Sequence, residues 1–485
     1  MDRSSNDRSR AAQREPCELE FDAGTLLLRG LERTDIDRHF DNSLWRFDAR
    51  VGAFRTDAMH YDSVRQTLDG LADRSLRYVD RVREWVSIDF AARSTEAVET
   101  VSLRDDQLAA VESWLKTRRG CVVMPTGTGK TEVALRLIAA CGQSALIVAP
   151  VRDLMYQWHR RILSRFGIDA GILGDGICRV SPLTVTTYDS AQIHMPRIGN
   201  RFGLVVFDEC HHLPGPARQD AARMSAAPYR LGLTATPERA DGRHQLLDPL
   251  IGGIVYSQRL SQARGKTLAD YNVQRIAIDL SDEERRRYSD LSRTVRDFVV
   301  QRRQEDPGFD WPALCNESGA DPEARRALRA FHAKRSIEDR AEDKLRILED
   351  LFRLHAGEPF LVFTGTNAMA RDISRKFLIP CLLSHCGKRE RLDILRGVEQ
   401  GDYPGIVANR VLDEGVDLPD VKLAIVIGGS GSSRQAIQRL GRVLRRSRFG
   451  AATIYEIVTR QTRDEIRSRR RRDNDAYQRR VDPGV

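Results

Sequence analysis

The stretch CVVMPTGTGKTEVAL, residues 121–135, contains two glycines followed by a lysine and a threonine. Gly127 and Gly129 allow the backbone to turn so tightly that its N–H groups can approach the oxygens of a phosphate. Lys130 adds a full positive charge, and the hydroxyl of Thr131 is suited to bind Mg²⁺. An apolar run precedes the turn and a helical pattern follows it, so the positive end of a helix faces the same anion. We therefore predict a phosphate-binding loop that consists of Thr126, Gly127, Thr128, Gly129, Lys130 and Thr131.

An Asp-Glu pair ends a second apolar run, FGLVVFDECHHL, downstream of this loop. Mg²⁺ on a nucleotide requires carboxylate ligands, and the water that attacks the γ-phosphate requires a base. We expect Asp208 to hold Mg²⁺ through its water shell and Glu209 to orient and polarise the attacking water. An Asp-Glu pair on an exposed loop is the competing interpretation, which the position directly after an apolar strand disfavours.

A third group of side chains is needed to stabilise the charge that builds on the transferred phosphoryl group. RQAIQRLGRVLRR, residues 434–446, places Gln438, Arg442 and Arg445 on one face of a helix. Arginine from a facing domain has this role in many nucleotide hydrolases. We predict that these residues complete the catalytic site, and a solvated charged helix is the alternative.

Strand-sized apolar runs alternate with helical ones in residues 99–257, which is typical of a parallel sheet covered by helices. The runs are GCVVMP, ALIVAP, LTVTT, LVVFDE and YRLGLTAT. A second series in residues 258–462 consists of PFLVFTGT, PCLLSH, YPGIVAN, VKLAIVIGG and ATIYEIV. We therefore predict an α/β fold with two tandem parallel-sheet domains that face each other across one nucleotide.

Four further segments do not belong to this alternation. Residues 1–17 are mixed in charge and predict a disordered lead, whereas residues 18–98 predict a small N-terminal α/β domain. A charged segment at about residues 283–346 has a helical period and is interrupted by DPGFDWPALCNESGADPE, which predicts an inserted helical hairpin. Residues 463–485 are arginine-rich and predict a basic C-terminal tail. A solvated helix or tail and a nucleic-acid contact agree equally well with their composition.

The composition excludes several classes of protein. The 485 residues carry a formal net charge of +9, which suits a polyanionic partner. The eight cysteines include no CxxC pair, so neither a disulfide framework nor a zinc ribbon is indicated. No apolar run is long enough to cross a membrane and the first residues lack a secretory signal, so we expect a cytoplasmic protein that binds no membrane.

The order of these motifs resembles that of superfamily 2 helicases of the DEAD/DEAH type, from about residue 103 to residue 460. PTGTGKT resembles the sequence motif of the phosphate loop in such motor ATPases. APVRDLMYQW, VTTYDSA and FTGTN resemble their elements that contact a nucleic-acid strand. The resemblance implies two RecA-like domains, base contacts from Arg104 and Gln107 in LRDDQ, and nucleotide contacts from Gly415 and Asp417 in VLDEGVDLPD.

Within that superfamily the chain resembles the XPB-type DNA repair helicases. Arg239 and Asp241 flank Ala240 where that family has an Arg-Glu-Asp motif implicated in DNA opening. The hairpin resembles the family's thumb-like extension, and residues 18–98 resemble its damage-recognition domain. The resemblance implies that Thr234 and Thr236 of TAT couple hydrolysis to movement. Three arginines of the hairpin are expected to contact DNA, with packing or surface ion pairs as the alternative: Arg325, Arg326 and Arg329.

These resemblances imply an ATPase motor that DNA stimulates, most simply a helicase or duplex translocase in DNA repair, with ATP and Mg²⁺ as cofactors. Duplex, forked or single-stranded DNA is the expected partner of a monomeric chain, together with a nuclease or another repair protein. The alternatives are an ATP-switched DNA-binding remodelling subunit, an RNA helicase and a small-molecule kinase.

Overall fold

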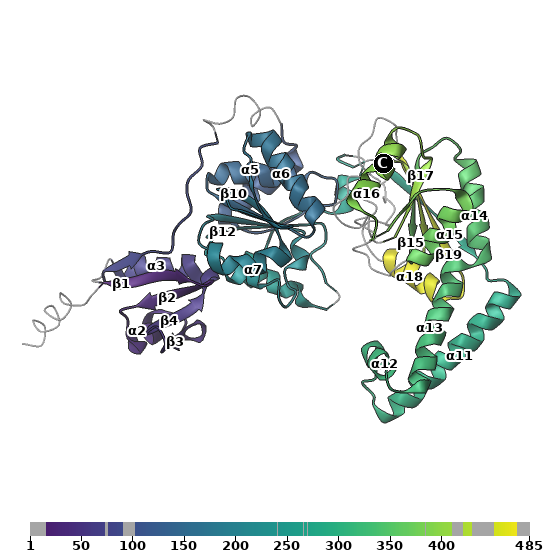
Figure 1. Cartoon of the computed structure of the whole chain (residues 1–485), viewed down its shortest axis with the longest axis horizontal. Coiled ribbons are helices and arrows are strands. Elements are labelled where there is room, and N and C mark those ends of the chain that lie inside the picture. The colour runs from purple at the N-terminus through teal and green to yellow at the C-terminus, as the bar shows by residue number, and fades with distance from the viewer. Residues whose placement is uncertain are drawn as a thin grey trace, which may run out of the picture. The chain divides into compact units, whose positions relative to one another are not determined.

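The computed structural model describes residues 16–72, 76–90, 102–239, 241–264, 266–268, 270–383, 385–409, 421–428 and 451–472. The chain divides into two compact units, Met1–Gln258 and Arg259–Val485, and each is described by itself (Figure 1). No helix in these ranges is long and apolar enough to cross a membrane.

The first unit begins with a small sheet of order β3-β4-β2-β1-β5. Its strands are β1 (Cys17–Asp22), β2 (Thr25–Arg29), β3 (Arg46–Asp48), β4 (Ala53–Asp57) and β5 (Tyr78–Asp80). The helices are α2 (Arg33–His39) and α3 (Tyr61–Ala72), with short 3-10 turns η1 (Asn42–Leu44) and η2 (Ala58–His60). The side chains of Leu19, Leu28, Ile36, Trp45 and Leu68 fill the core between the sheet and these helices. The predicted small N-terminal α/β domain is therefore present.

This small domain is tied by hydrogen bonds to the larger domain that follows it. The amide of Asn200 donates to the carbonyl of Val82 at 3.0 Å, and the N–H of Ser144 donates to the carbonyl of Val86 at 2.8 Å. Gly24 has a φ of 85°, and a Cβ on it would lie 2.6 Å from Cγ of Met224. The glycine is required both for this backbone conformation and for the close approach.

An eight-stranded sheet of order β13-β6-β12-β11-β7-β10-β8-β9 forms the centre of the first unit. Its strands are β6 (Arg119–Val123), β7 (Ala145–Ala149), β8 (Gly171–Gly174), β9 (Ile177–Arg179), β10 (Leu183–Thr187), β11 (Leu204–Asp208), β12 (Tyr229–Thr234) and β13 (Ile254–Ser257). All paired strands are parallel except β9 on β8. The five runs predicted as strands are β6, β7, β10, β11 and β12, which confirms the parallel-sheet α/β prediction.

Helices cover both faces of this sheet (Figure 1). The helices are α4 (Asp105–Thr117), α5 (Lys130–Cys141), α6 (Arg152–Phe166), α7 (Tyr188–Ile198), α8 (Asp220–Arg223) and α9 (Leu247–Ile251), with 3-10 turns η3 (Cys210–His212) and η4 (Arg243–Leu246). Alternate residues of β7 enter different cores, because Ile147 packs with α5 and α6 whereas Leu146 and Val148 pack with α7. Burial on both faces explains why the strands read as continuous apolar runs.

The second unit contains a six-stranded, fully parallel sheet of order β14-β19-β18-β15-β17-β16. Its strands are β14 (Tyr271–Ile278), β15 (Phe360–Thr364), β16 (Cys381–Leu382), β17 (Gly405–Ala408), β18 (Leu423–Ile427) and β19 (Ala452–Thr459). The described helices around it are α10 (Leu260–Ala263), α14 (Glu342–Leu354), α15 (Asn367–Phe377), α16 (Lys388–Glu399) and α18 (Arg463–Arg472). The five apolar runs of the second series all lie in strands of this sheet.

The helical insertion consists of α11 (Asp282–Glu305), α12 (Trp311–Glu317) and α13 (Pro322–Arg340). The long helices α11 and α13 lie side by side and extend away from the sheet, with α12 at the far end (Figure 1). Phe298, Phe309 and Leu314 form a small core there with Ala324 and Ala327. The insertion predicted at 283–346 is thus a hairpin of 282–340 with a third helix in its interrupted part, and α14 packs on the sheet instead.

Ion pairs attach α18 both to α14 and to the base of this hairpin. Lys344 Nζ lies 2.7 Å from Asp464 Oδ2, and both side chains are fully buried. Arg467 lies 2.6 Å from Glu338 Oε2 on α13, and the hydroxyl of Tyr288 on α11 donates to the other oxygen of Glu338 at 2.8 Å. The first ten residues of the segment predicted as a basic tail therefore belong to the folded unit, because their acidic and small residues face inward.

We predict that Asp464→Ala destabilises the second unit by about 3–5 kcal/mol, since it leaves the Lys344 charge buried without its partner. Calorimetric unfolding of the full chain measures this. Asp350→Ala is the matched control, because its ion pair with Arg353 is exposed and 4.0 Å long; its expected change is within about 0.5 kcal/mol. Equal small effects of the two variants would contradict the role given to the buried pair.

Candidate ATP-binding and coupling site

The predicted phosphate loop lies between β6 and α5, at the carboxyl edge of the first parallel sheet. Gly127 and Gly129 have φ values of 86° and 85°, a region that side chains with a Cβ rarely adopt. A Cβ at Gly129 would also lie 2.3 Å from Nε2 of Gln107. The hydroxyl of Thr128 is buried and donates to the carbonyl of Pro125 at 2.7 Å. The loop is therefore held in its turned form by contacts of its own and of α4.

Two polar groups of the loop are suited to accept a phosphate. Lys130 Nζ donates to the carbonyl of Met124 at 3.1 Å, and an ammonium group has three donors. The hydroxyl oxygen of Thr126 is buried and has no hydrogen-bond partner among the described residues. A buried hydroxyl without a partner is unfavourable unless a ligand or water satisfies it. Together with the N-terminus of α5, these groups fit the phosphates of a nucleotide.

Arg104 and Gln107, the residues expected at the adenine base, both contact the phosphate loop. Gln107 is 3 % exposed, and its Nε2 donates to the carbonyl of Thr128 at 3.1 Å. A guanidinium N–H of Arg104 donates to the same carbonyl. Sequence reasoning missed this link, because nothing in LRDDQ indicates which backbone its side chains reach.

Strand order places the acidic pair beside the loop. β12 pairs in parallel with β6 on one side and with β11 on the other. The carboxyl ends of β6 and β11 therefore lie on the same edge of the sheet, separated by β12 alone. Asp208, at the end of β11, is 8 % exposed. Glu209 follows with a φ of 47° and a ψ of 54°, a left-handed conformation that costs about 1–3 kcal/mol for a residue other than glycine. This bend turns the chain sharply directly after the strand.

The environment of the two carboxyl groups separates their acidities. Burial, and then the charge of Glu209, raise the pKa of Asp208 to about 6. Burial also acts to raise the pKa of Glu209, but the Lys130 ammonium and the His211 ring outweigh it and lower that pKa to about 2. Glu209 is therefore ionised and can accept a proton. A cation bound at Asp208 would lower the raised pKa of Asp208 and so favour its negatively charged form.

Two aromatic side chains donate hydrogen bonds to Asp208 from opposite faces of the sheet. Trp158 on α6 is 2 % exposed, and its Nε1 donates to Asp208 Oδ2 at 2.8 Å. The hydroxyl of Tyr188 on α7 donates to the main-chain carbonyl of Asp208 at 3.0 Å. Burial raises the pKa of Tyr188 well above its ordinary value, so it remains a donor. Both residues come from APVRDLMYQW and VTTYDSA, the segments that resemble strand-contacting elements.

A chain of polar contacts joins the acidic pair to TAT and to Arg239. His211 Nδ1 lies 3.0 Å from Thr234 Oγ1 and 3.4 Å from Glu209 Oε2. Thr234 Oγ1 also donates to the carbonyl of Thr236 at 3.1 Å. Arg239 donates to the carbonyl of His211 at 2.7 Å. The TAT segment and the segment at Arg239 are therefore both fixed to the loop that follows Asp208.

The charges at either end of the Arg-Ala-Asp segment bind each other. Arg239 Nε and Nη2 lie 2.9 and 2.6 Å from the two oxygens of Asp241. This bidentate pair raises the pKa of Arg239 and lowers that of Asp241. Sequence reasoning assigned both residues to coupling or DNA, and the structure places them next to the ATP-site loop.

In the second unit, FTGTN follows β15 at the carboxyl edge of the sheet. Thr364 Oγ1 donates to the carbonyl of Ala408 at 3.3 Å, and Thr366 Oγ1 caps α15 by accepting from the N–H of Met369 at 3.2 Å. Five residues predicted for the catalytic or nucleotide site of this domain lie outside the described residues: Gly415, Asp417, Gln438, Arg442 and Arg445.

The three arginines expected to contact DNA are all on α13, but they are not equivalent. Arg325 donates to the carbonyls of Ser318 and Gly319 at 3.1 and 2.8 Å. These bonds cap the C-terminal end of α12. Arg326 and Arg329 are exposed. The buried side of α13 includes Ala324, Ala327 and Ala330, of which Ala324 and Ala327 share a core with Phe298 of α11.

Comparisons with known proteins agree with this arrangement. Residues 19–82 match the Xeroderma pigmentosum group B helicase damage recognition domain, residues 100–239 the res subunit of type III restriction enzymes, and residues 343–447 the helicase conserved C-terminal domain. The crystal structure of the Pyrococcus furiosus Hef helicase domain is similar with a TM-score of 0.52. It is 18 % identical in sequence and the match covers 76 % of this chain and 98 % of that one, which supports the fold alone.

Two curated relatives carry XPB names. The DNA 3'-5' translocase XPB2 of Sulfurisphaera tokodaii is 43 % identical over 376 residues, which cover 77 % of this chain and 85 % of that protein. The DNA 3'-5' helicase XPB of Kineococcus radiotolerans is 29 % identical, and the match covers 75 % of this chain and 61 % of that protein. The resemblance predicted from the motifs is thus confirmed, and the chain belongs to the XPB family of superfamily 2 helicases.

Proposed function

We propose that this chain is an ATP-hydrolysing motor on DNA, an XPB-type helicase or duplex translocase that acts in DNA repair. The observation that carries the proposal is the pair of hydrogen bonds that Asp208 receives from Trp158 and Tyr188. Both donors come from segments that resemble strand-contacting elements, so a strand that shifts α6 or α7 also shifts this carboxylate. The names of the relatives, a DNA translocase and a DNA helicase, support the same activity.

ATP and Mg²⁺ are the cofactors that the family implies, and the described residues fit both. We propose that Lys130 and the loop backbone bind the phosphates, and that Thr131 and Asp208 hold Mg²⁺. The metal, when bound, neutralises negative charge on the phosphates. Glu209, ionised and next to Lys130, is placed to accept the proton of the attacking water.

The second domain supplies the remaining parts of the proposed site. We infer from the sequence that Gln438, Arg442 and Arg445 stabilise the developing phosphoryl charge and that Gly415 and Asp417 face the nucleotide. Closing of two such domains on ATP, and reopening after hydrolysis, would move one strand-contacting surface relative to the other.

The movement would reach DNA through the contacts described for the first unit. We propose that Thr234 and Thr236 transmit the state of the ATP site through His211, and that Arg239 and Asp241 respond because Arg239 is bound to the same loop. Arg326 and Arg329 remain candidates for phosphate contacts, whereas Arg325 serves the fold of the hairpin. A nuclease or another repair protein is the partner proposed on resemblance.

Glu209→Gln is expected to lower ATP hydrolysis by about 10²-fold or more, because the amide cannot take the proton of the attacking water. The affinity for a fluorescent ATP analogue and for DNA should stay within a few-fold of the parent, since the side chain keeps its shape. Steady-state hydrolysis and equilibrium binding measure the two quantities.

Glu112→Gln is the control for the loss of one negative charge, because Glu112 is exposed on α4. Its hydrolysis rate should equal that of the parent. A Glu209→Gln protein that still hydrolyses ATP at the parent rate would exclude Glu209 as the base, and loss of nucleotide affinity together with turnover would make it a structural residue.

Trp158→Phe is expected to raise the Mg²⁺ concentration needed for binding of a non-hydrolysable ATP analogue by roughly three- to tenfold. Its physical reason is the loss of one hydrogen bond to the carboxylate, since a typical hydrogen bond contributes a net free energy of about 0.5–1.5 kcal/mol. Binding of the analogue across a Mg²⁺ series is the measurement, so the result does not depend on catalysis.

Trp114→Phe is the matched control. Trp114 is also fully buried, and its Nε1 donates to the carbonyl of Arg230 at 3.1 Å, away from the acidic pair. It should lower thermal stability as Trp158→Phe does but leave the Mg²⁺ dependence unchanged. The same Mg²⁺ dependence in both variants would show that Trp158 acts only through packing.

A further inference from the structure

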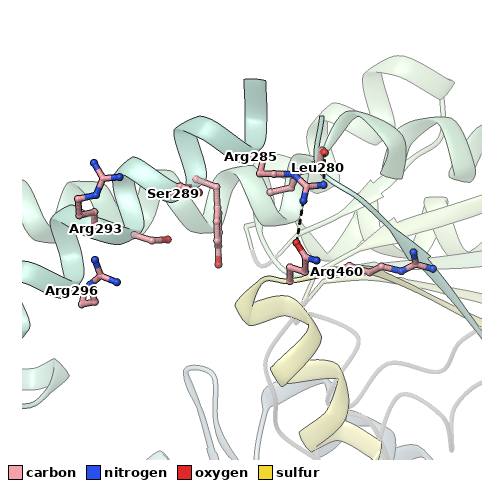
Figure 2. Close-up of a pocket in the computed structure, with 9 residues that line it drawn as sticks. Leu280, Arg285, Ser289, Arg293, Arg296 and Arg460 are labelled. Atoms are coloured by element: carbon pink, nitrogen blue, oxygen red, sulfur yellow. Dashed lines mark hydrogen bonds between the residues drawn. The ribbon is translucent and has the colours of Figure 1, made fainter. Parts of the chain in front are cut away.

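A groove lined by arginine lies where the helical hairpin joins the six-stranded sheet of the second unit. One wall is formed by α11, and the other by Arg460 and Gln461, which directly follow β19 (Figure 2). The groove has a volume of about 400 Å³, and none of its lining residues is acidic. The lining consists of Leu280, Arg285, Tyr288, Ser289, Ser292, Arg293, Arg296, Arg460 and Gln461.

The positive charges of the groove are available to an anion. Arg293, Arg296 and Arg460 each lie 3.3–3.6 Å from a carboxylate outside the lining, and these side chains are exposed. Exposed pairs of this kind contribute about 0–1 kcal/mol, so a phosphate can replace the carboxylate at little cost. Arg285 is bound by neutral acceptors, Gln461 Oε1 at 3.1 Å and the carbonyl of Leu280 at 3.4 Å.

One enclosed polar atom in the groove indicates that a ligand belongs there. The hydroxyl oxygen of Ser292 is buried and has no hydrogen-bond partner among the described residues. Its neighbour in the lining, Tyr288, already uses its hydroxyl in bonds to Glu338 and to the N–H of Arg463. A phosphate oxygen that accepts from Ser292 would satisfy the unpaired group.

The groove lies on the edge of the sheet that carries FTGTN. All strands are parallel, and Thr459 at the end of β19 is in register with Ile278 at the end of β14. β18 alone separates β19 from β15, whose last residue is Thr364, so the two strands are about 10 Å apart. A strand in contact with FTGTN can therefore extend to Arg460 within a few nucleotides.

The spacing of arginine and serine residues along α11 also suits a polyanion. Arg285, Ser289, Ser292 and Arg296 recur at intervals of three or four residues and so share one face of the helix. From Arg285 to Arg296 the helix rises about 16 Å, which is long enough to run beside several phosphates of one strand.

We propose that this groove binds the phosphate backbone of the DNA on which the motor acts. The proposal rests on the proposed function and adds a binding surface to it. The groove offers guanidinium and hydroxyl groups and no wall shaped for a base, so the contact is independent of sequence. It is distinct from the exposed arginines of α13, because its basic residues belong to α11 and to the segment directly after β19.

The test is the double variant Arg293→Gln/Arg296→Gln in the full chain. Arg285 is left in place because its hydrogen bonds hold the end of the groove. Fluorescence anisotropy with a labelled duplex that has a single-stranded extension gives the affinity across a salt series. The slope of log affinity against log salt should fall by up to about 0.9 for each lost phosphate contact, thus by up to about two units. Hydrolysis of ATP without DNA should be unchanged.

Arg346→Gln/Arg353→Gln is the matched control, because both arginines are exposed on α14 and have carboxylate partners three residues away, as Arg293 does. An equal loss of slope in the control would reduce the effect to net charge and overturn the proposal. An unchanged slope in the groove variant would overturn it as well. A parent chain that fails to bind DNA would refute the proposed function itself.

Discussion

A buried carboxylate at the end of a parallel strand is the constraint on which the first unit depends. Asp208 can remain at 8 % exposure because donors satisfy it: Trp158 bonds one oxygen and the N–H of Glu209 bonds the other. Tyr188 holds its main-chain carbonyl. Since Trp158 and Tyr188 belong to helices on opposite faces of the sheet, the position of this carboxylate depends on both helices. Hydrogen bonds thus link the candidate ATP site directly to the two segments that resemble strand-contacting elements.

The second unit meets a different constraint, which is to hold a long helical hairpin on a small sheet. The attachment is polar, because Arg467 of α18 and Tyr288 of α11 both bind Glu338 of α13. The buried pair of Lys344 and Asp464 holds α18 on α14. Such a network is directional, so it fixes the angle of the hairpin in a way that apolar packing alone does not. The arginine-lined groove lies at this same junction, and its shape follows from that fixed angle.

Local chemistry explains what could be predicted from the sequence. The glycines of the phosphate loop, the acidic pair after β11 and the apolar strands follow from backbone conformation and burial within a few residues. Gln107 contacts the phosphate loop at residues 21 positions away, and Trp158 contacts Asp208 at a distance of 50 positions along the chain. No local sequence pattern predicts such contacts. The arginines that dominate residues 463–485 left a solvated helix and a tail as alternatives, and only the structure shows that Asp464 and Ser468 are buried.

The central claim is that contact with DNA acts on the ATP site through the helices that hold Asp208. The most direct test is the rate of ATP hydrolysis by the full chain with and without a duplex that has a single-stranded extension, with Lys130→Ala as the background. We expect that DNA raises the rate severalfold or more and that the Lys130→Ala protein stays near zero in both conditions. Equal rates with and without DNA in the parent protein would contradict it.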